Sequence, residues 1–132
     1  MSTIFSKIIS GELPAHKVAE TSEYLAFLDI NPLREGHVLV IPKLEIDYLF
    51  DIEDEQYAGL MIFAKVVAKA IKKAIPCKKI GLAVIGLEVA HAHVHLIPMD
   101  QVSDMDFNKP KLNPTEKELS EVALRILEAL KD

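Results

Sequence analysis

The amino-acid sequence predicts an α+β fold, and three patterns along the chain support that class. Two segments, 54–75 and 115–131, place apolar residues at helical spacing. Short apolar runs at 37–42 and 80–85 have the length and composition of strands. The segment 91–97 alternates histidine with apolar residues, as a strand with two different faces does.

The chain is expected to form one domain over residues 1–132, because its length suits a single modest core. Its first two strands are expected at 17–20 and 24–30, where they form a short hairpin. In the strand that follows, His37 and Leu39 share a face because side chains alternate along extended backbone.

The helix expected at 54–75 carries charges in the order that the helix dipole favours. Acidic residues occupy 53–55 at its start, whereas Lys72 and Lys73 lie near its end and Pro76 stops it. Both ends of this helix are therefore defined by the sequence.

The remainder of the chain is expected to contain two strands and a second helix. The strand at 80–85 leads through a turn at 86–88 into the histidine-containing strand, and a polar connection follows at 100–114. The sequence Thr115-Glu116-Lys117-Glu118 is a capping box, so we expect a C-terminal helix at about 115–131.

The segment 91–97 is the leading candidate for the functional site. In an extended strand, His91, His93 and His95 share one face, and the apolar residues between them share the other. At about 3.4 Å of rise per residue, His91 and His95 would lie about 13–14 Å apart. Three such imidazoles can hardly converge on one zinc ion, although two could share a metal with help from elsewhere.

A phosphate ester or anhydride suits this row of imidazoles better than a metal does. Its oxygens accept hydrogen bonds from ring nitrogens, and a linear substrate lying along the strand can contact several rings. The central imidazole can attack phosphorus and form a covalent intermediate. For that attack one ring nitrogen must be free, and a backbone carbonyl is expected to hold the proton on the other.

The segment also resembles the His-φ-His-φ-His-φ-φ signature of the histidine-triad (HIT) nucleotide hydrolases and transferases, where φ is apolar. Segments 3–15, 26–32 and 36–43 are similar to other parts of that family and occur in the same order. The resemblance implies a HIT-like fold, with an antiparallel meander sheet of about five strands, one central helix and a C-terminal helix.

The resemblance, together with the chemistry of the side chains, implies roles for individual residues. His93 is the expected nucleophile at the α-phosphorus, His95 is expected to hydrogen-bond the phosphate oxygens, and His91 to support its neighbours. His37 matches an additional active-site histidine, and Asp29 matches the residue that binds ribose hydroxyls. The expected walls of a purine slot are Phe5, Ile8, Phe27, Ile30 and Leu39.

The loop before the triad differs from that of many HIT proteins, because it is shorter and lacks their asparagine. Gly86 keeps a glycine whose N–H can approach phosphate, but Leu87 and Glu88 replace a common glutamine and a common serine or threonine. Some members hold a structural zinc on a Cys-x-x-Cys pair. The corresponding residues here are Thr3 and Ser6, so we expect no metal and no cofactor.

Composition limits the partners of the protein. The 15 basic residues are outnumbered by 20 acidic ones, which argues against a nucleic-acid platform, and no apolar run approaches the length of a membrane span. Cys77 is the only cysteine, which suits a reducing cytoplasm. The family resemblance further implies a homodimer.

The resemblance, together with the chemistry of the side chains, therefore implies a cytoplasmic hydrolase that binds a purine nucleotide and cleaves a bond at its α-phosphate. A nucleoside phosphoramidate or related nucleotidyl conjugate is the expected substrate, through a covalent nucleotidyl-histidine intermediate. Two alternatives stay open: a dinucleoside polyphosphate hydrolase, and a nucleotide-binding regulatory module with little turnover.

Overall fold

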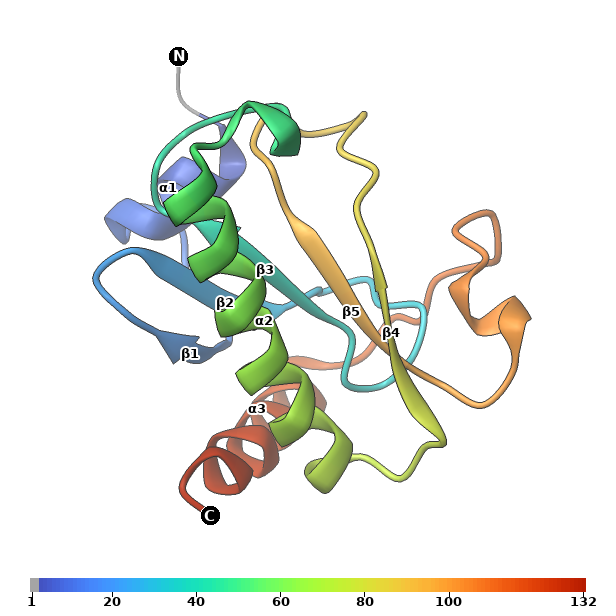
Figure 1. The fold of residues 1–132 in the computed structure, drawn as a ribbon. Coiled ribbons are helices and arrows are strands. Elements are labelled where there is room, and N and C mark those ends of the chain that lie inside the picture. The colour runs from blue at the N-terminus through green and yellow to red at the C-terminus, as the bar shows by residue number, and fades with distance from the viewer. Residues whose placement is uncertain (1–2) are drawn as a thin grey trace.

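The computed structural model describes residues 3–132, in which five antiparallel strands form one open sheet (Figure 1). The order across the sheet is β1-β2-β3-β5-β4. The first three strands follow one another as a meander, whereas β5 lies between β3 and β4. The bounds of the strands are β1 Lys17–Glu20, β2 Tyr24–Leu28, β3 Val38–Pro42, β4 Lys79–Ala83 and β5 Val94–Met99.

Three α-helices accompany the sheet, so the predicted α+β class is confirmed. They are α1 (Ile4–Ser10), α2 (Asp54–Ala74) and α3 (Glu116–Leu130). Two short 3₁₀ helices, η1 (Leu49–Asp51) and η2 (Val102–Met105), lie in the connections. None of the helices in the described residues has the length and apolarity that crossing a membrane requires.

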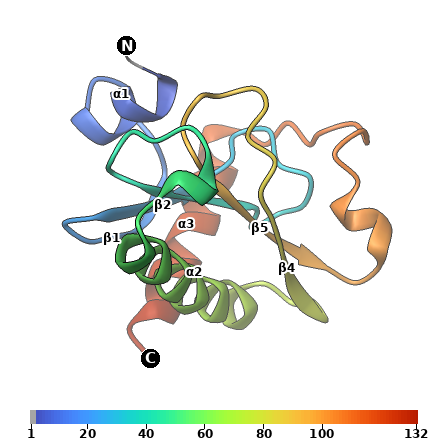
Figure 2. The same cartoon turned by 45° about the horizontal axis from the view of Figure 1, so that its top comes forward.

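The two faces of the sheet have separate apolar cores. On one face, residues such as Val40, Val94 and Leu96 pack against α2 and α3. On the other face, Leu25, Phe27, Leu39 and Ile41 pack against Phe5 and Ile8 of α1. Figure 2 shows α1 on the side of the sheet opposite to α2. Since His37 and Leu39 share a face, the histidines lie on the α1 side.

The helix bounds agree closely with the sequence. The predicted acidic start and lysine-rich end of α2 are present, and Thr115 caps α3 by accepting a hydrogen bond from the Glu118 N–H, as the capping box predicted. The helix α1 was not predicted from the sequence. Thr3 and Ser6 form a capping box at its start, so residues compared above with a zinc-binding pair cap a helix instead.

Three strand boundaries were predicted wrongly. The segment 24–30 is a strand only to Leu28, because the backbone turns at Asp29, and β4 ends at Ala83 rather than at residue 85. The strand predicted at 91–97 begins only at Val94. Before that point the Ala92 N–H donates to the Ile46 carbonyl, which ties the chain to the connection after β3 instead of to β3 itself.

Candidate active site

A cavity of about 850 Å³ opens on the α1 side of the sheet. Its volume lies within the range of small-molecule sites. Among the residues proposed from the sequence, those that line this cavity are Phe5, Ile8, Phe27, Asp29, Ile30, His37, Leu39, Gly86, Leu87, Glu88, His93 and His95. His91 is the exception, since its side chain is fully buried and is not part of the cavity wall.

His93 has a lone pair available on the ring nitrogen needed for nucleophilic attack. Its Nδ1 lies 2.8 Å from the carbonyl oxygen of His91. A carbonyl can only accept, so Nδ1 carries the proton and Nε2 is left with a free lone pair. Phe5 packs edge-on against the ring, with the centroids 4.9 Å apart, and helps to fix its plane. The expected carbonyl is thus present, and it belongs to another residue of the triad.

The side chain of His91 holds that carbonyl in place. Its Nε2 donates to the Pro42 carbonyl oxygen at 2.8 Å, and the His91 N–H donates to Val89. Within residues 3–132, no hydrogen-bond partner lies near its buried Nδ1. An unsatisfied buried acceptor costs about 1–3 kcal/mol of folding free energy. The other hydrogen bonds of His91 hold its ring in place despite this cost. This geometry agrees with a supporting role for His91.

His37 and His95 form a chain of hydrogen bonds that assigns both tautomers. The Leu33 N–H donates to His37 Nδ1 at 3.1 Å, so the proton of His37 resides on Nε2. That Nε2–H donates to His95 Nδ1 at 3.0 Å. The proton of His95 therefore resides on its own Nε2, where it can be donated to a substrate oxygen.

Both rings are neutral at pH 7. Burial, with smaller contributions from the neighbouring His95 and Lys111, lowers the pKa of His37 to about 3. Burial also lowers the pKa of His95 to about 4, with smaller contributions from His93 and Lys111. The cavity wall consequently offers hydrogen-bond donors here rather than positive charge.

Asp29 begins the turn after β2 and also faces the cavity. Its Oδ1 accepts from the Asn31 N–H at 2.9 Å, which closes the turn, and its Oδ2 lies 3.7 Å from His37 Nε2. Burial raises the pKa of this carboxyl, whereas the hydrogen bond from Asn31 acts in the opposite direction. One carboxylate oxygen is thus committed to the turn, and the other faces the site.

The cavity has an apolar half and a loop at its rim. Phe5 and Phe27 meet edge to face with their centroids 5.6 Å apart, whereas Ile30 is largely exposed. In the loop before the triad, Gly86 has a positive φ of 69°, and Leu87 is 89% exposed. A planar ring can therefore enter between buried aromatic side chains and a loop that has open space around it.

Comparison with known proteins identifies the family to which this chain belongs. The model of the HIT domain matches residues 10–102. The chain belongs to the HIT family. An uncharacterised HIT-like protein of Borreliella burgdorferi is 36% identical over 131 residues, covering 93% of this chain and 94% of that protein.

Two further HIT proteins are similar to this chain. An adenosine 5′-monophosphoramidase of Saccharomyces cerevisiae is 45% identical over 96 residues, which are 72% of this chain and 61% of that protein. The crystal structure of a HIT-like protein involved in cell-cycle regulation from Bartonella henselae, solved with an unknown ligand, superposes with a TM-score of 0.85 at 31% identity. That superposition covers 97% of this chain and 96% of the other.

The part of the site that follows β5, where the HIT motifs end, was not predicted from the sequence. Phe107, Asn108 and Lys111 line the cavity, and the ring of Phe107 packs edge-on against His95 with the centroids 4.8 Å apart. Phe107 is the only aromatic residue in the polar segment 100–114, which was the one available signal. His16 also lines the cavity and contacts Glu116 at 2.9 Å.

One group of side chains in the described residues has atoms close enough together to be considered as a metal site. The ligand atoms of Asp29, His37 and His95 all lie within 4.8 Å of one another. A metal there would need a lone pair on His37 Nε2, but the hydrogen bond from the Leu33 N–H places the proton of His37 on that atom. These residues suit a hydrogen-bonded chain better than a metal.

Proposed function

We propose that this chain is a nucleotidyl hydrolase that binds a purine nucleotide and cleaves a bond at its α-phosphate. The preferred substrate is a nucleoside phosphoramidate or related nucleotidyl conjugate. The observation that carries the proposal is the tautomer of His93, whose Nδ1–H is held by the His91 carbonyl while Nε2 has its lone pair available at the cavity. The similarity to an adenosine 5′-monophosphoramidase supports the substrate class.

The reaction follows from these two nitrogens and the phosphorus. Nε2 of His93 attacks the α-phosphorus, the bond from phosphorus to the leaving nitrogen breaks, and the leaving amine takes a proton from water. The imidazole of His93, now bonded to phosphorus, becomes cationic, and the His91 carbonyl oxygen accepts from its Nδ1–H and stabilises that charge. Water then cleaves the new P–N bond, which releases the nucleoside monophosphate and restores the free imidazole.

His95 supports the same step by a hydrogen bond. Its Nε2–H is available to a phosphate oxygen as negative charge develops there, because His37 occupies its other nitrogen. Asp29 is proposed to bind the ribose hydroxyls, and the space between Phe5 and Phe27 to hold the base. No metal and no cofactor takes part in this proposal.

The charges around the cavity favour a phosphoramidate over a dinucleoside polyphosphate. The carboxylate-bearing residues of the wall are Asp29, Glu88 and Glu116, and Lys111 is the one lysine or arginine among the described residues that line it. A polyphosphate chain would bring several negative charges to this wall, whereas a phosphoramidate brings a single α-phosphate and a leaving group that departs as an amine.

Rapid quenching of the wild type with an adenosine phosphoramidate tests the proposal. Under alkaline conditions that spare P–N bonds, an adenylylated peptide containing residues 91–95 is expected, with the label on His93. In His93→Ala turnover should fall by several orders of magnitude, while AMP binding should fall far less because the ribose and base contacts remain. A label on His91 or His95, or wild-type turnover in His93→Ala, would contradict the mechanism. Binding without any turnover would favour the regulatory module.

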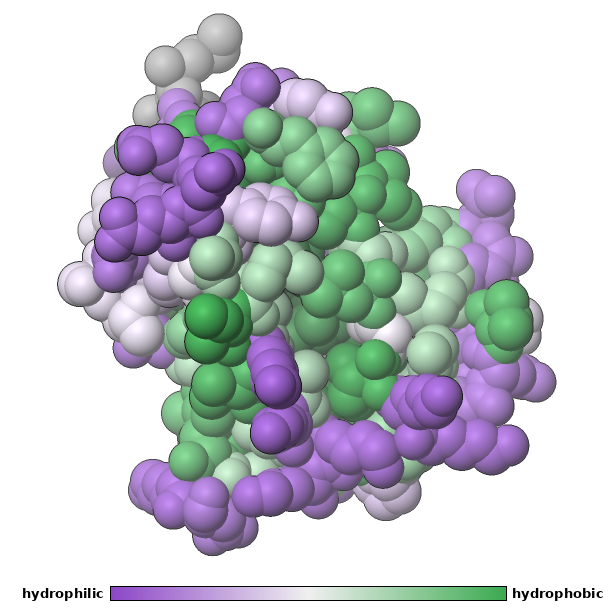
Figure 3. Space-filling view, viewed as in Figure 1, coloured by the Kyte–Doolittle hydropathy of each residue, from purple (hydrophilic) through white to green (hydrophobic). Residues whose placement is uncertain are grey.

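We also propose that the protein is a cytoplasmic homodimer. Within the described residues β4 pairs only with β5, so its outer edge is free. Beside it, Ile62 and Val66 of α2 and Leu82 of β4 are about half exposed or more, and Figure 3 shows apolar surface on this face. A two-fold interface would bury the same patch on both chains. Sedimentation equilibrium that finds only a 14.7 kDa species at high concentration would refute the dimer.

A further inference from the structure

The segment 106–112 holds a cationic side chain at the mouth of the cavity. Lys111 lines the cavity, and its Nζ donates to the Phe107 carbonyl oxygen at 2.6 Å and to the Lys109 carbonyl oxygen at 3.5 Å. These neutral carbonyls do not cancel its charge. Its charge also influences Asp29, His37 and His95, since it lowers the pKa of all three groups.

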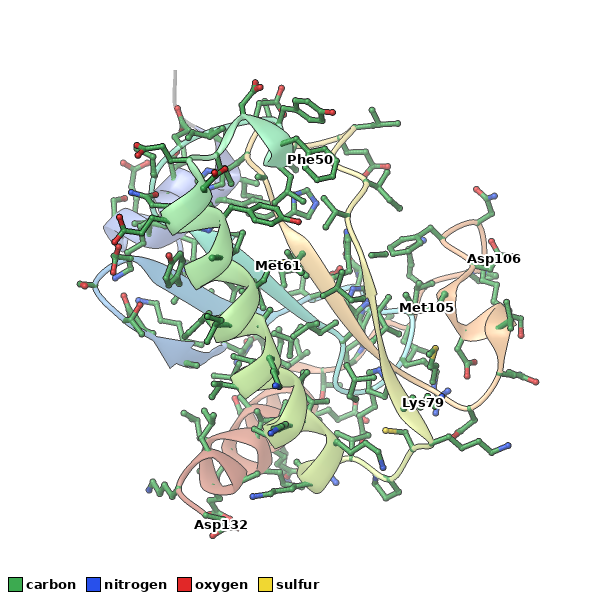
Figure 4. All side chains as sticks on the ribbon, viewed as in Figure 1. Phe50, Met61, Lys79, Met105, Asp106 and Asp132 are labelled. Atoms are coloured by element: carbon green, nitrogen blue, oxygen red, sulfur yellow. The ribbon has the colours of Figure 1, made fainter. Side chains whose placement is uncertain are left out.

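The segment is fixed on both sides of Lys111, to β5 and to the connection between β2 and β3. Phe107 packs against His95, and the Leu112 N–H donates to the Pro32 carbonyl oxygen at 2.8 Å. Figure 4 labels Met105 and Asp106, where the chain leaves η2 beside β4 and turns back towards the sheet. Met105 covers Gly81 of β4 so closely that an added Cβ would come within 2.7 Å of its Sδ. The lysine is thus carried by an anchored part of the chain.

An anionic substrate needs a positive charge that the histidines do not supply. His37 and His95 are neutral at pH 7, as shown above, while three carboxylate-bearing residues line the same cavity. Lys111 is the one residue of the described wall with a permanent positive charge. An ammonium on a flexible stem can leave a carbonyl for a phosphate within the same cavity.

We infer that Lys111 is a phosphate-binding residue, whose Nζ moves from the Phe107 carbonyl oxygen to an oxygen of the α-phosphate when a nucleotide binds. The inference rests on the proposed function and names the group that recognises the charge of its substrate. Lys111 acts on the ground-state charge of the phosphate, so it lowers KM more than it raises kcat.

Binding of AMP and of adenosine, measured by calorimetry, separates this role from a structural one. Lys111→Ala should weaken AMP about fivefold, as expected for one partly exposed charge pair, and leave adenosine unchanged. Lys111→Arg should retain most of the AMP affinity. Lys109→Ala is the matched control, since Lys109 is exposed on the same segment and does not line the cavity, and it should leave both ligands unaffected.

Kinetics and salt provide an independent readout. With an adenosine phosphoramidate, Lys111→Ala should raise KM about fivefold with little change in kcat, and the AMP affinity of this variant should depend less on salt than that of the wild type. Unchanged AMP affinity in Lys111→Ala, or equal weakening of AMP and adenosine, would overturn the inference and leave the proposed function standing. A wild type that binds neither ligand and turns over no phosphoramidate would overturn both.

Discussion

The buried pair of His37 and His95 makes the stability of the protein depend on pH. In the folded chain burial lowers the pKa of His37 to about 3, whereas an unfolded histidine titrates near the ordinary value of 6.5. Below pH 6.5 the unfolded chain therefore binds a proton that the folded chain does not. Stability is fully present above this pH and is lost as the pH falls towards the folded pKa.

The size of the loss follows from the two pKa values. At pH 5 the solution is about 1.5 units below the unfolded pKa, which corresponds to about 2 kcal/mol of stability lost through His37. His95, with its pKa lowered to about 4, adds a loss of nearly the same size, because pH 5 still lies about one unit above its folded pKa. The wild type should therefore lose about 4 kcal/mol from this pair between pH 7 and pH 5.

Urea unfolding of the wild type and of His37→Asn at both pH values measures this contribution. The asparagine carbonyl can still accept from the Leu33 N–H, so the turn is kept, but the titrating ring is gone. The variant should be less stable at pH 7 and should lose about 2 kcal/mol less than the wild type on going to pH 5. The comparison cancels the carboxylates, which titrate in both proteins. Equal losses of stability in the two proteins would show that folded His37 takes up a proton by pH 5, and that its pKa is not lowered by burial.

Three further predictions concern charge, packing and metal. Glu88 is exposed, so Glu88→Ser should strengthen AMP binding only about twofold, which is about 0.4 kcal/mol. An unscreened pair of charges at about 4 Å and a dielectric of about 20 would interact by roughly 4 kcal/mol. Unchanged affinity would place this carboxylate away from the phosphate. Gly59→Ala should destabilise the fold in thermal unfolding, because an added Cβ meets the Tyr24 hydroxyl; the clash, about 1–3 kcal/mol, exceeds the gain in helix propensity of about 1 kcal/mol. Activity should survive EDTA, and elemental analysis that finds one zinc per chain, lost together with activity, would contradict the mechanism proposed for His93.

The sequence was sufficient to predict the five strands, α2, α3 and about half of the residues that line the cavity. Alternation in the strands and spacing in the helices depend on local chemistry, so α2 and α3 were placed to within about a residue or two. The need for a carbonyl at His93 Nδ1 also followed from chemistry alone. The residue that supplies this carbonyl, His91, could not be named, because its position depends on the bend before Val94.

The features that were missed depend on contacts between distant parts of the chain. The strand fails at His91 because Ala92 pairs with Ile46, which no pattern within 91–97 reveals. The tautomer of His95 is set through His37 by a backbone N–H of Leu33, which lies 62 positions earlier in the chain. Phe107 and Lys111 occur in a polar segment without periodicity, so their approach to the cavity had no signal beyond one aromatic side chain.

The position of β5 between β3 and β4 has a consequence for how the chain folds. During synthesis β1, β2 and β3 emerge first and can pair as a meander, but β4 has no partner until β5 is made, since β3 and β4 do not pair with each other. The contacts that complete the sheet thus span more than fifty residues, from Val40 to Val94, and they form slowly for that reason. His95 lies on this late strand, so the imidazole chain with His37 assembles only when the strand has been inserted. A nascent chain in which β5 has not yet been made therefore lacks the hydrogen bond between His37 and His95.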